Sequence, residues 1–204
     1  MLIERGKMLG KFCTIEAYTD GASKLKYKIG AWAYSICSDQ VEVSYDYKCI
    51  ENATNNQMEI TAMIECFKAL TQCSGEIIHI CSDSKYLLNG ISHIYTSLSD
   101  GNQDFHIRWI DKWKNNGWKT LENKEVSNKE LWLELDKIYN ELLNKGNRIE
   151  FFHVRGHGKS GIIIDGNDRV DLLCNVAMKK YFDEKGWKWN GKKIKFEEYN
   201  KNLF

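Results

Sequence analysis

The sequence has no proline, no long apolar run and almost no net charge. None of its apolar stretches approaches the ~20 residues that cross a bilayer. Residues 1–11 lack the apolar stretch, roughly 7–15 residues long, that marks a signal peptide. We therefore expect no membrane partner. A formal net charge of +1 gives no global signature of nucleic-acid binding, so positive charge for that purpose would have to be local.

The cysteines show no pairing pattern. They number seven and stand singly, without a CxxC pair, at Cys13, Cys37, Cys49, Cys66, Cys73, Cys81 and Cys174. An odd number of scattered cysteines favours free thiols in a reducing compartment, which predicts a cytoplasmic protein. The hydrophobic fraction of 43% and the charged fraction of 28% are ordinary for a globular domain with a core.

Hydrophobic patterning predicts a single mixed α/β domain over residues 12–182. Strands are expected at 12–18, 31–37, 41–49, 76–81 and 148–154. Five helices are expected. The first runs from an N-cap at Asn55 or Asn56 to about 73, the second from after Ser84 to about 90, and the third over 105–116. The fourth begins with a capping box, Ser127-x-x-Glu130, and the fifth runs from 167 to about 182. The order is βββ-α-β-α-α-β-α, and a right-handed crossover should make the fourth strand a parallel neighbour. A short N-terminal extension (1–11) and a C-terminal tail of unknown role (183–204) flank the domain.

Four acids occupy positions that suit chemistry. Asp20 and Asp83 each follow a predicted strand, Glu59 lies in the first turn of a helix, and Asp171 lies one turn into the last helix. Sites in open α/β sheets gather at the carboxyl ends of strands. Clustered carboxylates repel one another unless a cation neutralises them, and Mg²⁺ prefers such oxygen ligands. Two such ions ~4 Å apart can activate water and stabilise a leaving oxygen in phosphoryl transfer.

Each of these acids also has an ordinary interpretation. An Asp at a strand end is usually a turn or cap residue. A Glu in a first helical turn commonly complements the helix dipole, and Asp171 could serve the same purpose. Spacing alone therefore leaves the metal site open.

The residues around these acids resemble the signatures of the type 1 ribonuclease H family (bacterial RNase HI-like). The segments, in the family's order, are Tyr18-Thr19-Asp20-Gly21-Ala22, Thr54-Asn55-Asn56-Gln57-Met58-Glu59, Ser82-Asp83-Ser84-Lys85-Tyr86, Arg155-Gly156-His157-Gly158 and Asn167-Asp168-Arg169-Val170-Asp171. Residues 109–120, with tryptophans at 109, 113 and 118, are similar to the family's basic protrusion, called the handle, and residues 128–132 continue that likeness. The resemblance covers residues 12–182.

The resemblance implies a fold and an activity. The fold would be the ribonuclease H-like fold, a five-stranded mixed sheet of order 3-2-1-4-5 flanked by helices. The activity would be an endoribonuclease that hydrolyses the RNA strand of RNA–DNA hybrids with two Mg²⁺ ions, leaving 5′-phosphate and 3′-hydroxyl ends, and Mn²⁺ is expected to substitute. Asp20 would bridge the ions, Asp171 would hold the ion that activates water, and Glu59 and Asp83 the ion at the leaving 3′ oxygen. We expect a monomer with no obligatory protein partner.

The resemblance also assigns a histidine. His157 matches the family's mobile-loop histidine, which is thought to move protons or help release product, and a free imidazole pKa of roughly 6.5 suits that task. Without the motif, a His beside glycines would be an exposed loop residue. His153, at a strand end, is expected to be structural.

Contacts to nucleic acid are predicted at Asn55, Asn56, Ser84, Lys114, Trp118 and Lys119. Amide side chains can bond the 2′-OH that distinguishes RNA from DNA, although helix capping is the alternative for the two asparagines. Local positive charge in the handle would grip phosphates. Trp109 and Trp113 are one helical turn apart and favour packing into the core, whereas Trp118 follows a glycine and better fits a contact.

Some segments depart from the family pattern. Three lysines stand in residues 23–30, where the family has glycine and proline, and the loop 158–166 is long and contains three isoleucines. Two other functions are alternatives: a module with this fold that binds hybrids without cutting, and a related transposase or structure-specific DNA nuclease. The four acids argue against the first, and the Asn-Asn-x-Met-Glu segment with the handle argues against the second.

Overall fold

Three long strands at the start of the chain form an antiparallel meander. They are β1 (Thr14–Lys24), β2 (Ile29–Ser38) and β3 (Val41–Glu51). The structure is a computed structural model, and it describes residues 14–155, 165–186 and 188. The first eight residues of β2 are all buried, because helices cover both faces of the sheet there. In β3 exposed residues alternate with half-buried ones along its first five positions, as expected for an edge strand.

Four further strands extend the sheet beyond β1. The strands β4 (Ile77–Ser82), β7 (Arg148–His153) and β5 (Ile94–Ser97) run parallel to β1, and β6 (Gln103–Phe105) pairs antiparallel with β5. The order is β3-β2-β1-β4-β7-β5-β6. The predicted α/β class and the order of the five predicted strands are confirmed. The sheet has two strands more than predicted, because β5 and β6 are too short to give a periodic sequence pattern.

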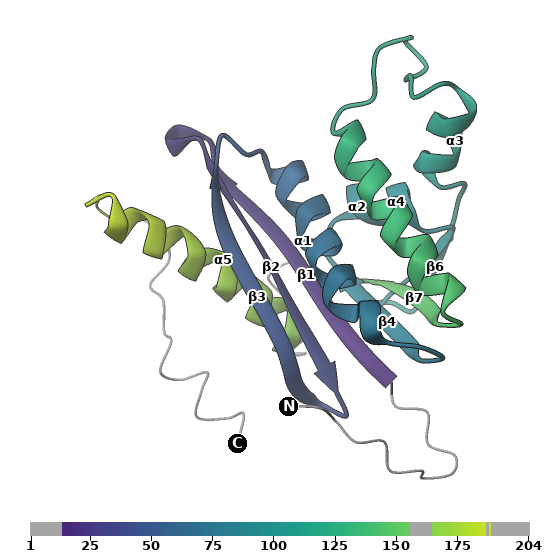
Figure 1. Ribbon diagram of the computed structural model, residues 1–204, viewed down its shortest axis with the longest axis horizontal. Helices are drawn as coiled ribbons and strands as arrows, with labels where there is room; N and C mark the ends of the chain where they lie inside the picture. The colour runs from purple at the N-terminus through teal and green to yellow at the C-terminus, as the bar shows by residue number, and fades with distance from the viewer. Residues whose placement is uncertain (1–13, 156–164, 187, 189–204) are drawn as a thin grey trace.

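Helices cover the two faces of the sheet (Figure 1). The helix α5 (Asp165–Glu184) packs on β1, β2 and β3, whereas α1 (Asn55–Ala69) packs on β1 and β2 from the other side and contacts α4 (Lys129–Asn144). The short helices α2 (Lys85–Ile91) and α3 (Trp109–Asn115) complete that layer. In the part of the chain that the structure describes, no helix has both the length and the apolar character needed to span a membrane.

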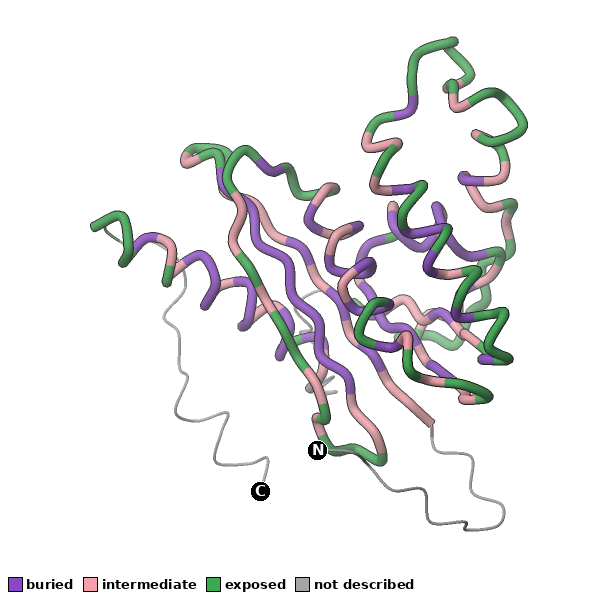
Figure 2. The backbone as a smooth tube through the Cα atoms, in the orientation of Figure 1, coloured by how far each residue is buried: buried purple, intermediate pink, exposed green. Residues whose placement is uncertain are grey.

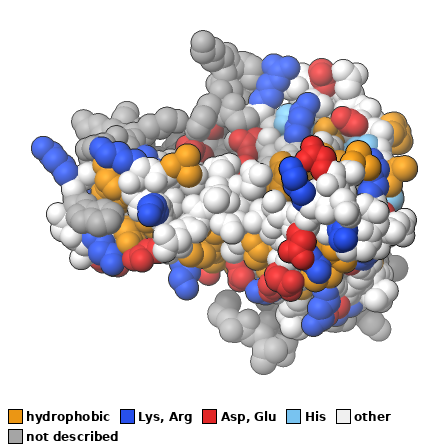
Figure 3. All heavy atoms as spheres, turned by 90° about the horizontal axis from the view of Figure 1, so that it is seen from above, with side chains coloured by type: hydrophobic (Ala, Val, Ile, Leu, Met, Phe, Trp, Pro, Cys, Tyr) orange, Lys and Arg blue, Asp and Glu red, His pale blue; other side chains and the backbone are white. Residues whose placement is uncertain are grey.

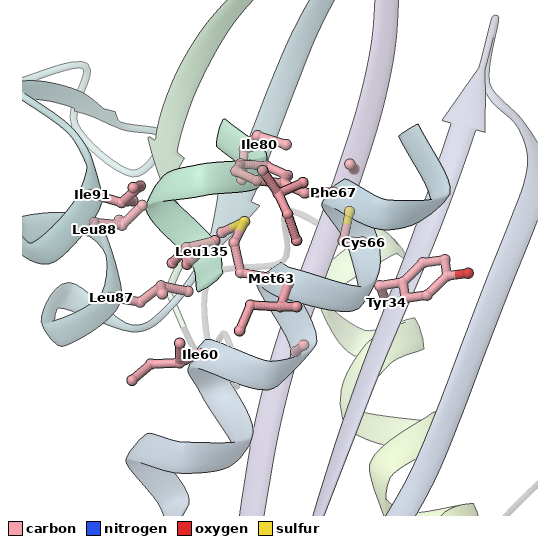
Figure 4. Close-up of a cluster of buried hydrophobic side chains, with 14 of the residues drawn as sticks. Tyr34, Ile60, Met63, Cys66, Phe67, Ile80, Leu87, Leu88, Ile91 and Leu135 are labelled. Atoms are coloured by element: carbon pink, nitrogen blue, oxygen red, sulfur yellow. The ribbon is translucent and has the colours of Figure 1, made fainter. Parts of the chain in front are cut away.

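The core has two parts, one on each face of the sheet. The larger part joins α1, α2, α4 and β4, and Figure 4 shows Ile60 and Met63 of α1 close to Leu87 of α2 and Leu135 of α4. The smaller part lies between β2 and α5 and includes Cys174. Figure 2 shows this division, with buried residues along the central strands and along the inner sides of the helices. All six cysteines that the structure describes are free thiols, as predicted.

Helix starts differ from the predicted ones in four places, and the smallest difference is at α5, which begins at Asp165 rather than at 167. Thr54, rather than Asn55 or Asn56, caps α1, and its side chain and that of Gln57 form a reciprocal capping box. The capping box predicted at Ser127 is wrong: α4 begins at Lys129 after Asn128, which has a left-handed backbone (φ 60°) and makes no side-chain cap hydrogen bond. The helix predicted from residue 105 begins at Trp109, because residues 103–105 are paired in β6.

Candidate active site

The first two acids lie where neighbouring parallel strands diverge. The pairing of β1 with β4 ends at Tyr18 and Cys81, but β1 continues to Lys24 because it stays paired with β2. Asp20 therefore extends past the end of β4, and Asp83 is the first residue after β4. This is the carboxyl edge of the parallel part of the sheet, where α/β proteins place their sites.

A cavity of about 230 Å³ opens at this edge. Its lining comes from β1, α1, the end of β4 and the start of α5, and consists of Asp20, Gly21, Ala22, Ser23, Asn55, Asp83, Asn167 and Asp171. Three of the four predicted carboxylates thus surround one cavity, although they lie as far as 151 positions apart in the sequence (20 to 171). Asn167, which is buried, joins them without having been predicted as a site residue.

Glycine 21 brings the fourth carboxylate close to the other three. A Cβ at this position would lie 2.2 Å from the backbone nitrogen of Glu59, so only glycine permits α1 to approach β1 this closely. The first turns of α1 are therefore pressed against the strand that carries Asp20. Gly21 belongs to a segment that resembles a family signature, but the reason for a glycine there is visible only in the fold.

The electrostatics of the site centre on Asp20. Burial, followed by the charges of Asp83 and Asp171, raises the pKa of Asp20 from 3.8 to about 7, and Glu59 adds a smaller contribution in the same direction. The backbone N–H of Gly21 donates a hydrogen bond of 2.8 Å to Asp20 Oδ1, which acts against this shift. A carboxylate held in such a cluster is a centre of unneutralised negative charge.

Glu59 is held by two hydrogen bonds, one from its own helix and one from the start of α2. Asn55 Nδ2 donates to its Oε1 at 2.7 Å, and the Ser84 hydroxyl donates to its Oε2. Burial raises the pKa of Glu59, while the bond from Ser84 opposes this rise. Ser84 also caps α2 by accepting the N–H of Leu87 at 3.2 Å. Two residues predicted to contact nucleic acid, Asn55 and Ser84, therefore orient a carboxylate.

The donor set suits a hard divalent cation. Carboxylate oxygens that raise one another's pKa are relieved by positive charge, and Mg²⁺ takes a few carboxylates together with waters. Among the described residues, no three His, Cys, Asp or Glu side chains are already gathered tightly enough to ligate one ion together. Glu59 is turned toward Asn55 and Ser84. Asp20, Asp83, Asp171 and Glu59 are the residues that could hold Mg²⁺.

An ion pair fixes the start of α5, which carries Asp171. Arg169 Nε and Nη2 each donate to Glu42 of β3 at 3.0 Å, and the two side chains are only 9% and 14% exposed. Arg169 also lies over the ring of Tyr45, 4.9 Å from its centroid. The sequence does not predict this contact, since nothing in the local pattern links residue 169 to residue 42.

The predicted handle residues have structural partners of their own. Lys114 Nζ bonds the buried Asp136 of α4 at 2.5 Å. Trp118 is half-buried and packs 6.3 Å from Trp113, ring to ring. The predicted packing of Trp113 into the core agrees with its contact of 5.5 Å with Trp132. Lys119 is exposed and pairs with Glu125 through a backbone bridge.

The structure describes two of the remaining predicted residues, Asn56 and His153, but not His157. Asn56 is exposed in the first turn of α1. His153 is half-buried at the end of β7, as expected. His157, together with most of the loop 158–166 and of the tail 183–204, lies outside the described residues.

Comparison with solved structures identifies the class of fold. The structure resembles LC9-RNase H1, described as a type 1 RNase H with the type 2 active-site motif, with a TM-score of 0.62 and 20% identity over 83% of this chain and 74% of that one. It also resembles LC11-RNase H1, solved in complex with an RNA/DNA hybrid, with a TM-score of 0.54 and 18% identity over 82% of this chain and 99% of that one. The fold is therefore the ribonuclease H fold.

Sequence comparison identifies the family. The RNase H family model matches residues 13–179. The chain is 37% identical over 163 residues to the ribonuclease H of Francisella tularensis subsp. novicida, covering 79% of this chain and 89% of that protein. It is equally similar, at 37% over 165 residues, to the ribonuclease H of Francisella philomiragia. The chain belongs to the ribonuclease H family.

Proposed function

We propose that the protein is an endoribonuclease that hydrolyses the RNA strand of RNA–DNA hybrids and requires Mg²⁺. The observation that carries the proposal is the meeting of acids from four different elements around the carboxyl edge of the sheet, in a chain of the ribonuclease H family. The relatives named ribonuclease H and the neighbour bound to an RNA/DNA hybrid support this substrate.

The four carboxylates would hold the metal. Asp20 is central, because the charges of the other three all act on it. Bound there, Mg²⁺ would supply an activated water and charge stabilisation for the leaving oxygen. Asp171 would hold metal on the side where water attacks. Glu59 and Asp83 would hold metal on the side of the leaving 3′ oxygen, so that cleavage leaves a 5′ phosphate.

Several neighbouring residues would position the site. Ser84 and Asn55 fix the carboxylate of Glu59, and Arg169 fixes the helix that carries Asp171. Asn56 is exposed beside this edge and could reach a 2′-OH of the RNA strand. His157 would assist proton movement or product release, and Lys119 would contact a phosphate.

A cleavage assay tests the proposal. An end-labelled RNA–DNA hybrid is incubated with the full chain in Mg²⁺ or in EDTA, beside Asp20→Asn and the matched control Asp46→Asn, which changes an exposed acid on β3. We expect RNA cleavage that requires Mg²⁺, is lost in Asp20→Asn and persists in Asp46→Asn. Intact RNA in Mg²⁺ at every pH tried would refute the activity. Equal cleavage of an RNA–RNA duplex would refute the hybrid as the substrate.

A further inference from the structure

A second cavity opens along the same edge of the sheet, on the side of β4 away from Asp20. Its volume is about 370 Å³, within the range of small-ligand pockets. Its lining comes from the ends of β7 and β5, from β6, and from the start of α2, and consists of Lys85, Tyr95, Ser97, Ser99, Asp100, Asn102, Gln103, Asp104, Phe105, His153 and Arg155. The β5–β6 hairpin, absent from the predicted fold, supplies most of it.

The hairpin cavity is adjacent to the carboxylates. The strands β1, β4, β7 and β5 are parallel, so the residues that follow them lie along one edge. His153 pairs in register with Ser82, the residue before Asp83. Lys85 lies only two positions after Asp83. A strand of nucleic acid that crosses Asp20 and Asp83 along this edge would next meet the hairpin cavity.

The hairpin itself is firmly held. Tyr95 donates its hydroxyl to Asp104 at 2.8 Å, and the Asn102 N–H donates to Asp100 at 3.1 Å. In the turn, the Ser97 N–H donates to the Asn102 carbonyl at 2.8 Å, and the Gly101 N–H donates to the Ser97 carbonyl at 2.8 Å. These contacts engage both acids of the cavity with donors from the hairpin, and the side chains of Lys85 and Arg155, which also line the cavity, are exposed.

The chemistry of the lining suits a nucleotide. Phe105 presents an aromatic ring that is 72% exposed, a platform on which a base could stack. Asn102 and Gln103 offer donors and acceptors to the edge of a base, and Lys85 and Arg155 offer positive charge to its phosphate. A base within a duplex has its pairing edge occupied and its faces stacked, so only an unpaired base could use such a cavity.

We propose that the hairpin cavity binds an unpaired nucleotide of the RNA strand where that strand leaves the hybrid. We assign this nucleotide to the RNA rather than to the DNA for one reason. The proposed function places the cleaved RNA strand along the edge that carries the carboxylates, and the cavity continues that edge. The inference rests on the proposed function. It adds a preference for hybrids whose RNA continues as a single strand.

Binding measured without divalent metal tests this preference apart from cleavage. The ligands are a blunt hybrid, the same hybrid with a short unpaired RNA extension at either end, and the same with unpaired DNA extensions. We expect one RNA extension to tighten binding about tenfold, the effect of stacking one base on an aromatic ring. Phe105→Ala should abolish the gain and leave blunt-hybrid binding unchanged. Phe105→Tyr should keep the gain, as should Val43→Ala, which removes an exposed apolar side chain at the opposite sheet edge.

Three results would overturn the inference. They are equal binding of blunt and extended hybrids by the wild type, a gain that survives Phe105→Ala, and an equal gain from DNA extensions. Cleavage of the blunt hybrid in Mg²⁺ is scored separately. Cleavage without any extension effect overturns the role of the hairpin cavity alone, whereas absence of cleavage overturns the proposed function.

Discussion

Replacing Asp20 by Asn should make the metal-free protein more stable while it abolishes activity. Burial and the charges of Asp83 and Asp171 raise the pKa of Asp20 from 3.8 to about 7. The folded state therefore binds this proton more tightly than the unfolded state does. Stability is then lost as the pH rises from about 4 to about 7, and the loss is complete above the folded pKa. An amide carries no charge and avoids the loss.

The size of the effect follows from the shift in pKa. A difference of about 3 pKa units, at about 1.4 kcal/mol per unit, gives an upper value of about 4 kcal/mol. Water entering the open cavity screens the charges, so we expect about half of this value, or about 2 kcal/mol. For a chain of this length that raises the unfolding temperature by roughly 4–8 °C. An Asn side chain can still accept the Gly21 N–H that Asp20 accepts at 2.8 Å.

Thermal and urea unfolding in EDTA at pH 5 and pH 8 measure the prediction. Asp20→Asn should exceed the wild type clearly at pH 8 and much less at pH 5, whereas the exposed control Asp46→Asn should differ little at either pH. Added Mg²⁺ should stabilise the wild type more than Asp20→Asn, because ligand binding to the folded state adds to its stability. The electrostatic reasoning is refuted if Asp20→Asn is destabilised at pH 8, or if its gain is the same at both pH values.

Three further changes test how the site is held. Gly21→Ala forces a Cβ against the α1 backbone and should cost about 2–4 kcal/mol in urea unfolding; a cost near zero would contradict the close packing. Arg169→Gln removes the bidentate pair with Glu42 and should cost about 2 kcal/mol and lower kcat, whereas an unchanged kcat would rule out positioning of α5. Lys114→Met leaves the buried Asp136 without its cation and should cost about 1–3 kcal/mol in unfolding. Weaker hybrid binding at unchanged stability would instead make Lys114 a nucleic-acid contact.

Local patterns placed the four acids on their elements, but only the resemblance to the ribonuclease H signatures joined them into one predicted site. Asp83 follows β4, and Asp20 lies on β1 two residues past its last pair with β4, so the parallel pairing of the two strands brings them to one edge. The place of Glu59 in the first turn of a helix was predicted from the sequence. Its closeness to Asp20 depends on the close packing of α1 against Gly21, which is a contact between two elements. The hydrophobic periodicity of a single sequence does not predict how closely a helix packs against a strand.

The features that could not be predicted are those that depend on long-range pairing. The hairpin of residues 94–105 contains strands of four and three residues, which are too short for alternation to distinguish them from a loop. Lys114 was predicted as a phosphate contact because it lies in a basic segment. Its bond to Asp136 arises only when α3 packs beside α4, which the sequence pattern does not encode.

Because the overall charge is small, binding of nucleic acid depends on the contacts made at the carboxyl edge of the sheet. Basic and acidic side chains are interspersed on the face seen in Figure 3, and the net charge of the chain is +1. Long-range attraction to a polyanion is therefore small, and the acids around Asp20 oppose the approach of phosphate until a cation neutralises them. Lys114, one of the lysines of the handle, is already engaged with Asp136. Short-range contacts along the edge therefore matter more than long-range attraction, and the hairpin cavity, lined by Lys85 and Arg155, is where we propose that some of them are made.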